Sequence, residues 1–260
     1  MSGSVLAGRH ALVTGASGGL GADFARELAR RGSNLTLVAR RKNLLEELAQ
    51  ELGGGHGVEV TPVGLDLTAP GAPEALAGQV RNVDVLVNNA GYGLFGQFWT
   101  IPWEREQNML QLDVVVPVHL TKLLLPGMIE RRFGFVLNLS SIGAYQPSPL
   151  YASYSAAKSF VLFFTEALSY ELRGTGVRAT ALSPGITATG FLQVAGQRAT
   201  RYQRRAMMQS PEVARIGIEA MLAGKPSVVA GRLNAATVFG NRLMPRRLSA
   251  ALAHRLMREQ

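Results

Sequence analysis

The sequence has 260 residues, 47% of them hydrophobic and 17% charged, so it can bury one sizeable core and we expect a single domain over residues 1–260. It contains no cysteine, which excludes disulfides, a thiolate nucleophile and sulfur-ligated metals, and its four histidines lack metal-ligand spacing, so we expect no metal site. The net charge of +9 would attract phosphorylated ligands, anionic lipid or nucleic acid, but no nucleic-acid-binding motif accompanies it, so we expect no nucleic-acid partner.

The basic surplus is concentrated late in the chain. Four arginines cluster between positions 198 and 205, and six more lie from Arg232 onward against Glu259 alone. Solvated helix faces are the favoured interpretation of this surplus. The first residues show no signal-peptide pattern, and we expect no later apolar stretch long enough to span a bilayer. We therefore expect a cytoplasmic protein.

Short apolar runs alternate with helical patterns along the chain. The runs that predict strands cover residues 10–14, 34–39, 58–63, 83–87, 133–139, 177–182 and 227–230. Strands that are apolar almost throughout are typical of a parallel sheet covered by helices on both faces. The pattern predicts an α/β fold, a single doubly wound (Rossmann-type) domain with a seven-stranded parallel sheet and a C-terminal helical extension.

The first predicted helix covers residues 19–31 and places Leu20, Phe24, Leu28 and Ala29 on one side. It ends at Gly32, a residue suited to the left-handed turn after a helix. The second predicted helix covers residues 42–52, and we expect the glycines at 53–55 to end it.

A glycine-rich segment, TGASGGLG at positions 14–21, connects the first strand to the first helix. Backbone amides and the helix dipole at such a junction can hold a pyrophosphate, and a Cβ would block the ligand's approach. The alternative is an ordinary turn. The strand before it and the helix after it favour the nucleotide interpretation.

The end of the second strand indicates the cofactor. An NAD enzyme normally presents a carboxylate there, whereas an NADP enzyme offers a guanidinium to the extra phosphate. This sequence has Arg40, Arg41 and Lys42 and no acid. Arg40 is the first candidate for the phosphate contact and Arg41 the second, and the alternative is a basic start to an exposed helix.

Tyr154 and Lys158 lie four residues apart, which places them on one face of a predicted helix. A free tyrosine has a pKa of about 10, so acid–base work near neutrality calls for a nearby cation that stabilises phenolate. Tyr151 lacks such a partner, because Ser155 stands four residues after it. We assign Tyr151 to packing or to the substrate wall.

These motifs together resemble the short-chain dehydrogenase/reductase family, whose glycine fingerprint TGxxxGxG is matched by Gly15, Gly19 and Gly21. The match extends over residues 8 to 231 and includes NNAG at 88–91, Asp66 after the third strand, and Pro184 with Gly185 after the sixth. The resemblance implies that Ser141, rather than Ser140, contacts the substrate oxygen. It also implies NADP(H) contacts from Ser17, Leu20, Asp66, Leu67, Asn89, Ala90, Gly91, Tyr154, Lys158, Pro184, Gly185, Ile186 and Thr189.

The resemblance breaks at Asp113. The family commonly has an asparagine there, in a phrase like Leu-Asn-Val, where its main-chain carbonyl helps hold a water next to the lysine. Either Asp113 serves in that place and interacts with Lys158, which makes it a candidate catalytic residue, or it is a helix residue that points to solvent.

The family's variable substrate lid falls at residues 186–210. Here it mixes four arginines with apolar residues, which suits an apolar substrate with an anionic group, such as a fatty acyl thioester, although such residues are more often core. The residues are Phe191, Leu192, Val194, Tyr202, Met207 and Met208 among Arg198, Arg201, Arg204 and Arg205. Aromatic residues after the NNAG segment are expected in the same pocket or in its packing: Tyr92, Phe95, Phe98 and Trp99.

The tail, residues 234–260, alternates apolar and arginine positions and predicts a basic amphipathic helix. It either lies on an anionic membrane surface or packs on its own subunit or a partner, and packing is favoured. The resemblance implies a homodimer or homotetramer through helices around 105–130 and 154–172, with Phe160, Phe163 and Phe164 at the interface.

The sequence therefore predicts an NADPH-dependent oxidoreductase that reduces a ketone, aldehyde or 3-oxoacyl carbonyl by hydride transfer while Tyr154 donates a proton. Two alternatives come from other classes. One is a non-catalytic NADP-binding regulator, which has no need of a proton donor. The other is a membrane- or nucleic-acid-associated protein that uses its basic tail.

Overall fold

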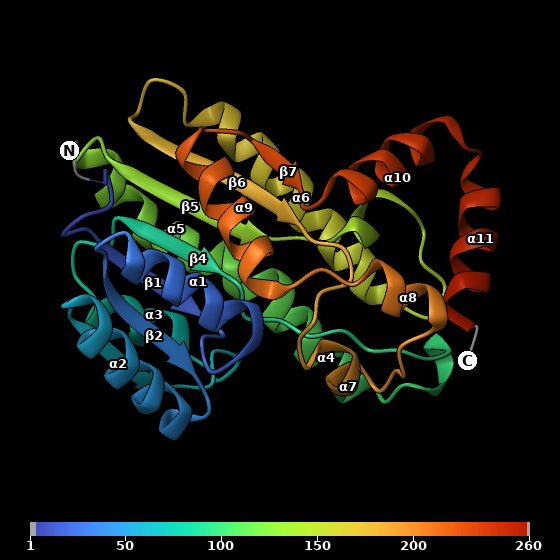
Figure 1. Cartoon of the computed structure of the whole chain (residues 1–260), viewed down its shortest axis with the longest axis horizontal. Helices are drawn as coiled ribbons and strands as arrows, with labels where there is room; N and C mark the ends of the chain where they lie inside the picture. The colour runs from blue at the N-terminus through green and yellow to red at the C-terminus, as the bar shows by residue number, and fades with distance from the viewer. Residues whose placement is uncertain (1–3, 259–260) are drawn as a thin grey trace.

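The computed structural model describes residues 4–258, apart from the side chain of Tyr202. Its centre is a seven-stranded sheet in the order β3-β2-β1-β4-β5-β6-β7, with every paired strand parallel (Figure 1). The predicted fold class is confirmed. The third and fourth strands begin two residues later than predicted. The strands are β1 (His10–Thr14), β2 (Asn34–Ala39), β3 (Val60–Gly64), β4 (Val85–Asn88), β5 (Gly134–Leu139), β6 (Val177–Ser183) and β7 (Ser227–Val229).

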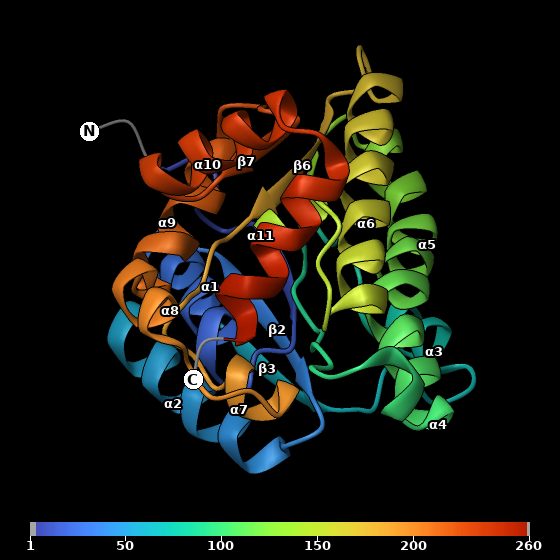
Figure 2. The same ribbon diagram turned by 90° about the vertical axis from the view of Figure 1, so that its right-hand side faces the viewer.

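Helices cover both faces of the sheet (Figure 2). One core cluster lies between the sheet and α1, α2 and α9, and a second lies between the sheet and α3, α5 and α6. The helices are α1 (Gly19–Arg30), α2 (Lys42–His56), α3 (Ala72–Gln79), α4 (Trp103–Leu110), α5 (Val116–Glu130), α6 (Ala152–Glu171), α7 (Phe191–Ala195), α8 (Arg201–Ala206), α9 (Ser210–Leu222), α10 (Arg232–Leu243) and α11 (Arg246–Arg258). Three single-turn segments are η1 (Phe98–Thr100), η2 (Gln111–Val115) and η3 (Ile142–Tyr145).

The strand order reverses between β1 and β4. From β1 the chain proceeds outward to β2 and β3, and it then returns to place β4 on the other side of β1. Connections leave the two neighbouring strands in opposite directions at such a point, which opens a crevice at their carboxyl ends. The glycine-rich segment after β1 and the Asn89–Gly91 segment after β4 both lie there.

The first two helices test the predicted boundaries. All four residues predicted to share one side of α1 are buried, and Gly32 has the expected positive φ of 85°. The prediction that residues 53–55 end α2 was wrong, because the helix continues to His56. Gly57 ends it instead in the left-handed conformation, and the three earlier glycines are tolerated in the last turn, where the cap compensates for their low helix propensity.

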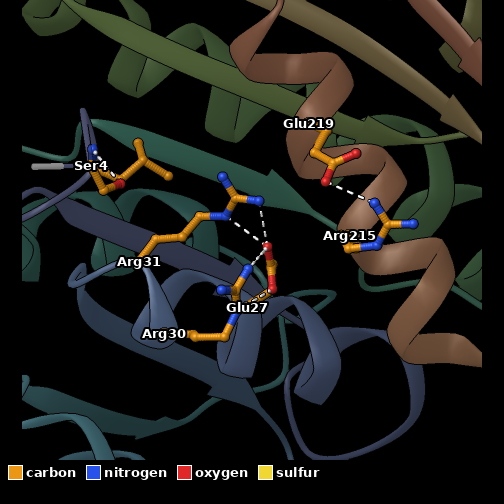
Figure 3. A network of polar contacts seen from close by, with 7 residues as sticks. Ser4, Glu27, Arg30, Arg31, Arg215 and Glu219 are labelled. Atoms are coloured by element: carbon orange, nitrogen blue, oxygen red, sulfur yellow. Dashed lines mark hydrogen bonds and ion pairs between the residues drawn. The ribbon is translucent and has the colours of Figure 1, made fainter. Parts of the chain in front are cut away.

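Polar contacts hold α1 beside α9. The Ser210 hydroxyl at the start of α9 donates to the Asp23 carboxylate at 2.5 Å. Figure 3 shows the neighbouring network, in which Glu27 accepts from Arg30 and Arg31 while Arg215 and Glu219 pair along α9. Burial works to raise the pKa of Glu27, but the hydrogen bonds from the two guanidinium groups outweigh it and lower that pKa. The Ser210–Asp23 bond joins the two helices, whereas the other pairs lie within α1 and its C-cap residue or within α9.

Residues Trp103–Glu130 form one continuous helix of 28 residues through α4, η2 and α5. Its length and apolar composition are sufficient to cross a membrane, so the expectation that no stretch reaches this length was wrong. Each of α4, η2 and α5 is too short to cross a membrane, and only their continuity in the structure gives the helix its length. In the fold, α5 packs on β5 and α3 and α4 packs on α6. The wide turn η2 in its middle carries Asp113.

The tail forms two helices rather than the single helix predicted for 234–260. Met244 has extended backbone angles and Pro245 follows it, so α10 ends at Leu243 and α11 begins at Arg246. A proline disfavours helical geometry in the residue before it, which explains the break. Residues 259 and 260 lie outside the described part of the chain. Figures 1 and 2 show α10 and α11 beyond the carboxyl ends of the strands, with α11 crossing in front of them.

Candidate active site

A cavity of about 630 Å³ opens at the carboxyl ends of the central strands. It lies at the reversal between β1 and β4, where a ligand crevice is expected. Most of the residues predicted for the site line it: Gly15, Ser17, Gly19, Leu20, Gly21, Arg41, Asn89, Ala90, Gly91, Ser141, Tyr154, Lys158, Pro184, Gly185, Ile186 and Thr189. Four predicted residues do not: Arg40, Asp66, Leu67 and Asp113.

Two glycines of the glycine-rich segment, Gly15 and Gly21, leave no room for a side chain. Gly15 has a φ of 69°, and a Cβ there would lie 2.8 Å from the Asn89 amide nitrogen. A Cβ on Gly21 would collide with the Gly15 carbonyl. No side chain caps α1, whose N-cap is Gly18, so its first backbone amides have no cap acceptor. Such a helix start attracts anions, and this cradle fits the pyrophosphate of a dinucleotide.

Polar contacts join the ends of β1 and β4 beneath this cradle. The Thr14 hydroxyl accepts from the backbone amides of Asn89 and Ala90, each at 3.0 Å. The Asn89 side-chain amide donates to the Thr14 carbonyl at 2.8 Å. Asn89 therefore positions the glycine turn.

Arg41 lies closer to the cradle than Arg40 does. Its guanidinium donates to the Ser17 hydroxyl at 3.0 Å and lines the cavity. Arg40 is exposed and its charge acts on Asp66, one of the predicted NADP(H) contacts. Burial works to raise the pKa of Asp66, but hydrogen bonds from Thr68 and the charge of Arg40 lower it overall. Both arginines border the same end of β2, on different sides.

Tyr154 and Lys158 lie on the first two turns of α6. The Tyr154 ring packs against Tyr151 and Phe191, with centroid distances of 5.7 and 5.4 Å. Lys158 is buried, its ammonium lies 5.6 Å from the Tyr154 ring centre, and it donates to the Leu139 carbonyl at 3.1 Å. The helical spacing thus places both side chains in the cavity wall.

The pKa of the Tyr154 phenol differs in direction from what the sequence led us to expect. Burial raises its pKa, the Asp113 carboxylate raises it further, and a hydrogen bond with Ser141 lowers it only in part. We expected the ammonium of Lys158 to lower this pKa. The Asp113 carboxylate pairs with that ammonium, and the phenol is the protonated, acid form over the neutral range.

The two neighbouring serines have different partners. Ser140 is buried and its hydroxyl donates to the Lys158 carbonyl at 2.9 Å. This hydroxyl therefore helps to hold α6 against the end of β5. The Ser141 hydroxyl lines the cavity and accepts from the Gly143 amide at 3.1 Å. Its own proton is available to a ligand or to Tyr154. The geometry therefore favours Ser141 as the substrate contact.

Tyr151 is buried beside Tyr154 and makes a different contact. Its hydroxyl donates to the Gln197 side-chain oxygen at 2.8 Å, and burial raises its pKa. Phe95 packs on its ring at a centroid distance of 5.4 Å. Tyr151 thus ties the cavity wall to the lid segment, as the assignment to packing or substrate wall anticipated.

Asp113 is buried and faces Lys158, so the solvent-facing alternative was wrong. Its carboxylate lies 3.1 Å from the ammonium and accepts from the Tyr92 backbone amide at 3.0 Å. Gly91 passes so close that a Cβ there would lie 2.6 Å from the carboxylate. Burial raises the pKa of Asp113, and the charge of Lys158 opposes that rise. The side chain thus lies behind the cavity wall and acts on Tyr154 through space.

The lid segment is apolar toward the cavity and basic toward solvent. Phe191, Leu192 and Val194 line the cavity, whereas Met208 packs on the core. The four clustered arginines are exposed and do not line the cavity, so they do not supply the predicted anion contact there: Arg198, Arg201, Arg204 and Arg205. The side chain of Tyr202 lies outside the described part of the chain. Among the nearby aromatic residues Tyr92 lines the cavity, and exposed Phe98 and Trp99 do not.

Residues of the tail complete the cavity, which the sequence did not indicate. They come from the inner sides of α10 and α11: Thr237, Val238, Asn241, Ser249, Leu252, Ala253, Leu256 and Met257. Gln146 after η3 accepts hydrogen bonds from Asn241 and Ser249. The Gln197 side-chain amide donates to the Met257 carbonyl at 3.4 Å. Only the amphipathic pattern of the tail hinted that one side of it is buried.

Comparison with known proteins identifies the sequence pattern. Residues 9–199 match the family model described as short chain dehydrogenase. An uncharacterized oxidoreductase of Myxococcus xanthus is 39% identical over 181 residues, which cover 68% of this chain and 71% of that protein. A very-long-chain 3-oxoacyl-CoA reductase of Anas platyrhynchos is 34% identical over 197 residues, 72% of this chain and 62% of that protein.

Solved structures match nearly the whole chain. A 7β-hydroxysteroid dehydrogenase superposes with a TM-score of 0.87 at 27% identity, covering 97% of this chain and 99% of that one. A short-chain dehydrogenase of Sphingobium yanoikuyae in complex with NADPH has a TM-score of 0.81 at 28% identity, covering 90% and 94%. One from Burkholderia phymatum, in complex with NAD, has a TM-score of 0.82 at 25% identity and covers 96% of each chain.

Proposed function

The chain belongs to the short-chain dehydrogenase family of oxidoreductases, and from this premise we propose that it reduces a bulky apolar ketone, aldehyde or 3-oxoacyl carbonyl with NADPH. The observation that carries the proposal is the position of Tyr154. Its phenol lies in one cavity with Ser141 and Lys158, beside an uncapped helix start that fits a dinucleotide.

The proposed chemistry divides between the cofactor and the cavity wall. Bound NADPH supplies the hydride that is added to the carbonyl carbon. Tyr154 gives its proton to the carbonyl oxygen, and Ser141 donates a hydrogen bond to the same oxygen as negative charge develops on it. The raised pKa of Tyr154 keeps the phenol protonated at neutral pH, which is the form that reduction requires.

The apolar wall supports a large substrate. Phe191, Leu192, Leu252, Leu256 and Met257 line the same cavity as Tyr154, and the Phe191 ring packs against the Tyr154 ring. Apolar pockets with few polar groups take ligands of matching character. Two of the matched proteins support such a substrate by their names, one a very-long-chain 3-oxoacyl-CoA reductase and the other a 7β-hydroxysteroid dehydrogenase.

A carbonyl panel tests this function. We expect NADPH oxidation with steroid ketones, long-chain 3-oxoacyl thioesters or medium-chain aldehydes, at kcat/KM values about tenfold or more above those for small polar ketones, because apolar surface is buried only by the larger compounds. The assay follows NADPH absorbance over a range of concentrations. Preference for small polar carbonyls contradicts the substrate class. Tight NADPH binding without turnover on any carbonyl favours the regulator alternative.

Cofactor preference is expected to depend on the arginines after β2. Replacing Arg41 with alanine removes a guanidinium at the edge of the cradle, and Arg40→Ala removes its neighbour. Because a hydrogen bond to a charged group contributes about 1.5–3 kcal/mol, each change should raise the KM for NADPH by about tenfold or more if that arginine binds the phosphate. The KM for NADH should change little.

Lys42→Ala is the matched control. Lys42 is exposed and pairs with Glu46 at 3.4 Å on the same helix, so its loss should leave both cofactor constants unchanged. Equal losses with NADPH and NADH in both arginine variants are incompatible with a phosphate contact from either residue.

We also propose that two copies associate through the α5 and α6 faces. Phe160 and Phe163 on α6 are 46% and 68% exposed, and Leu123 and Ile129 on α5 are also exposed. Phe164, by contrast, packs against the core of its own chain. An exposed apolar patch on two neighbouring helices is typical of an interface.

A further inference from the structure

The outer side of α10 carries large apolar side chains that nothing in the described chain covers. Leu233, Phe239 and Leu243 are 72%, 64% and 79% exposed. With 3.6 residues per turn they lie within an arc of about 120°. Asn234 and Val238, the buried residues of α10, lie on the opposite arc. The helix is therefore anchored by one side and presents an apolar stripe of three large side chains, Leu233, Phe239 and Leu243, on the other.

Exposed arginines accompany this stripe. Arg232 and Arg242 lie on α10, and Arg246, Arg247, Arg255 and Arg258 follow on α11, all of them exposed. The sequence has no acidic residue between positions 232 and 258. Leu248 on α11, 57% exposed, extends the apolar side chains beyond the break at Pro245. We call the outer sides of α10 and α11, with these residues, the tail surface.

Its charge decides what the tail surface can contact. Two copies meeting through this face would bring the six arginines of one against the six of the other, with no acidic residue among positions 232–258 to offset them, which is electrostatically unfavourable. A nucleic acid would satisfy the arginines but leave the leucine and phenylalanine side chains without an apolar environment. An anionic lipid surface satisfies both, because apolar side chains enter the acyl boundary while arginines meet the headgroups.

We propose that the tail surface docks the protein peripherally on an anionic lipid membrane. The long helix Trp103–Glu130 takes no part in this contact, since it covers the sheet and pairs with other helices. Docking needs only the three apolar side chains of α10, Leu248 and the arginines.

The same two helices separate this surface from the cavity. Val238 of α10 and Ser249, Ala253, Leu256 and Met257 of α11 face inward, and Leu252 both lines the cavity and is 44% exposed. A docked membrane would therefore lie against the wall of the cavity, with Leu252 at its rim. This arrangement suits a substrate that partitions into lipid, although docking itself does not depend on the reaction proposed above.

Vesicle sedimentation tests the proposal with the full chain. We expect binding to vesicles of phosphatidylglycerol and phosphatidylcholine, weak binding to phosphatidylcholine alone, and release as salt is raised. The variant Leu233→Ser/Phe239→Ser/Leu243→Ser should lower the vesicle partition coefficient by about tenfold or more. Arg242→Gln/Arg246→Gln should lower it by about tenfold and weaken its salt dependence.

Val5→Ser is the control, since Val5 is 53% exposed and precedes β1 at the amino ends of the strands, whereas the tail surface lies beyond their carboxyl ends. It should bind vesicles as the wild type does, with circular dichroism and solution mass recorded for every variant. The proposal is overturned if the wild type ignores anionic vesicles, or if the triple serine variant and the control lose binding equally. It is also overturned if the triple variant dissociates a dimer that the wild type forms, because the tail surface then joins two copies. Turnover enters none of these readouts, so failure here leaves the proposed reaction untouched.

Discussion

Tyr154→Phe should lower kcat for carbonyl reduction by about 10²- to 10⁴-fold, the range that positioned proton transfer contributes. The ring would keep its packing on Tyr151 and Phe191, so the change removes the proton and little else. Steady-state rates with the best carbonyl of the panel measure the loss. NADPH affinity, measured by fluorescence, should change far less, because the cradle around Gly15 and α1 is unaltered.

Tyr151→Phe provides the comparison. It removes a hydroxyl from the neighbouring ring, but that hydroxyl is bonded to Gln197 and is not free to donate to a ligand. We expect kcat to fall by less than about tenfold, in keeping with the loss of one hydrogen bond. Equal losses in the two variants, or full turnover in Tyr154→Phe, would contradict Tyr154 as the proton donor.

Asp113→Ala should destabilise the fold by about 3–5 kcal/mol, because it leaves the buried ammonium of Lys158 without its counter-charge. It also removes the acceptor of the Tyr92 amide. Urea unfolding followed by circular dichroism measures the change. Asp113→Asn should cost less, since an amide oxygen can still accept from Tyr92 and face the ammonium.

A double variant separates charge from packing. Asp113→Leu/Lys158→Met removes both buried charges and should be more stable than Asp113→Leu alone, because no unpaired ion remains. If the single and double variants are equally unstable, the 3.1 Å pair does not account for the loss.

The same carboxylate predicts a pH effect. Asp113 raises the pKa of Tyr154, and alcohol oxidation requires the phenolate, so Asp113→Asn should lower that pKa. Oxidation at neutral pH should then rise by on the order of tenfold, and the alkaline limb of reduction should move to lower pH. If Asp113 had only a structural role, Asp113→Asn would change stability but leave both pH profiles in place.

The fold followed from local patterns. Apolar strands between amphipathic helices predicted the parallel sheet, because strands buried on both faces have no polar side to show. The TGASGGLG segment and the four-residue spacing of Tyr154 and Lys158 predicted two walls of the cavity, since turn sterics and helical periodicity act over a few residues. The predicted boundaries of the elements were less accurate, because the glycines at 53–55 did not end α2 and Pro245 divided the tail into two helices.

Contacts between residues far apart in the chain could not be predicted from local sequence patterns. The pairing of Asp113 with Lys158, the placement of Arg41 rather than Arg40 against Ser17, and the bonds from Gln146 to α10 and α11 join residues far apart in the chain. No periodicity encodes such distances. The direction of the Tyr154 pKa depended on them as well, because burial and the Asp113 carboxylate outweigh the hydrogen bond from Ser141 only after the chain has folded. Residue spacing thus establishes the elements and the reacting groups, whereas packing sets their charges, their neighbours and the wall that the tail contributes.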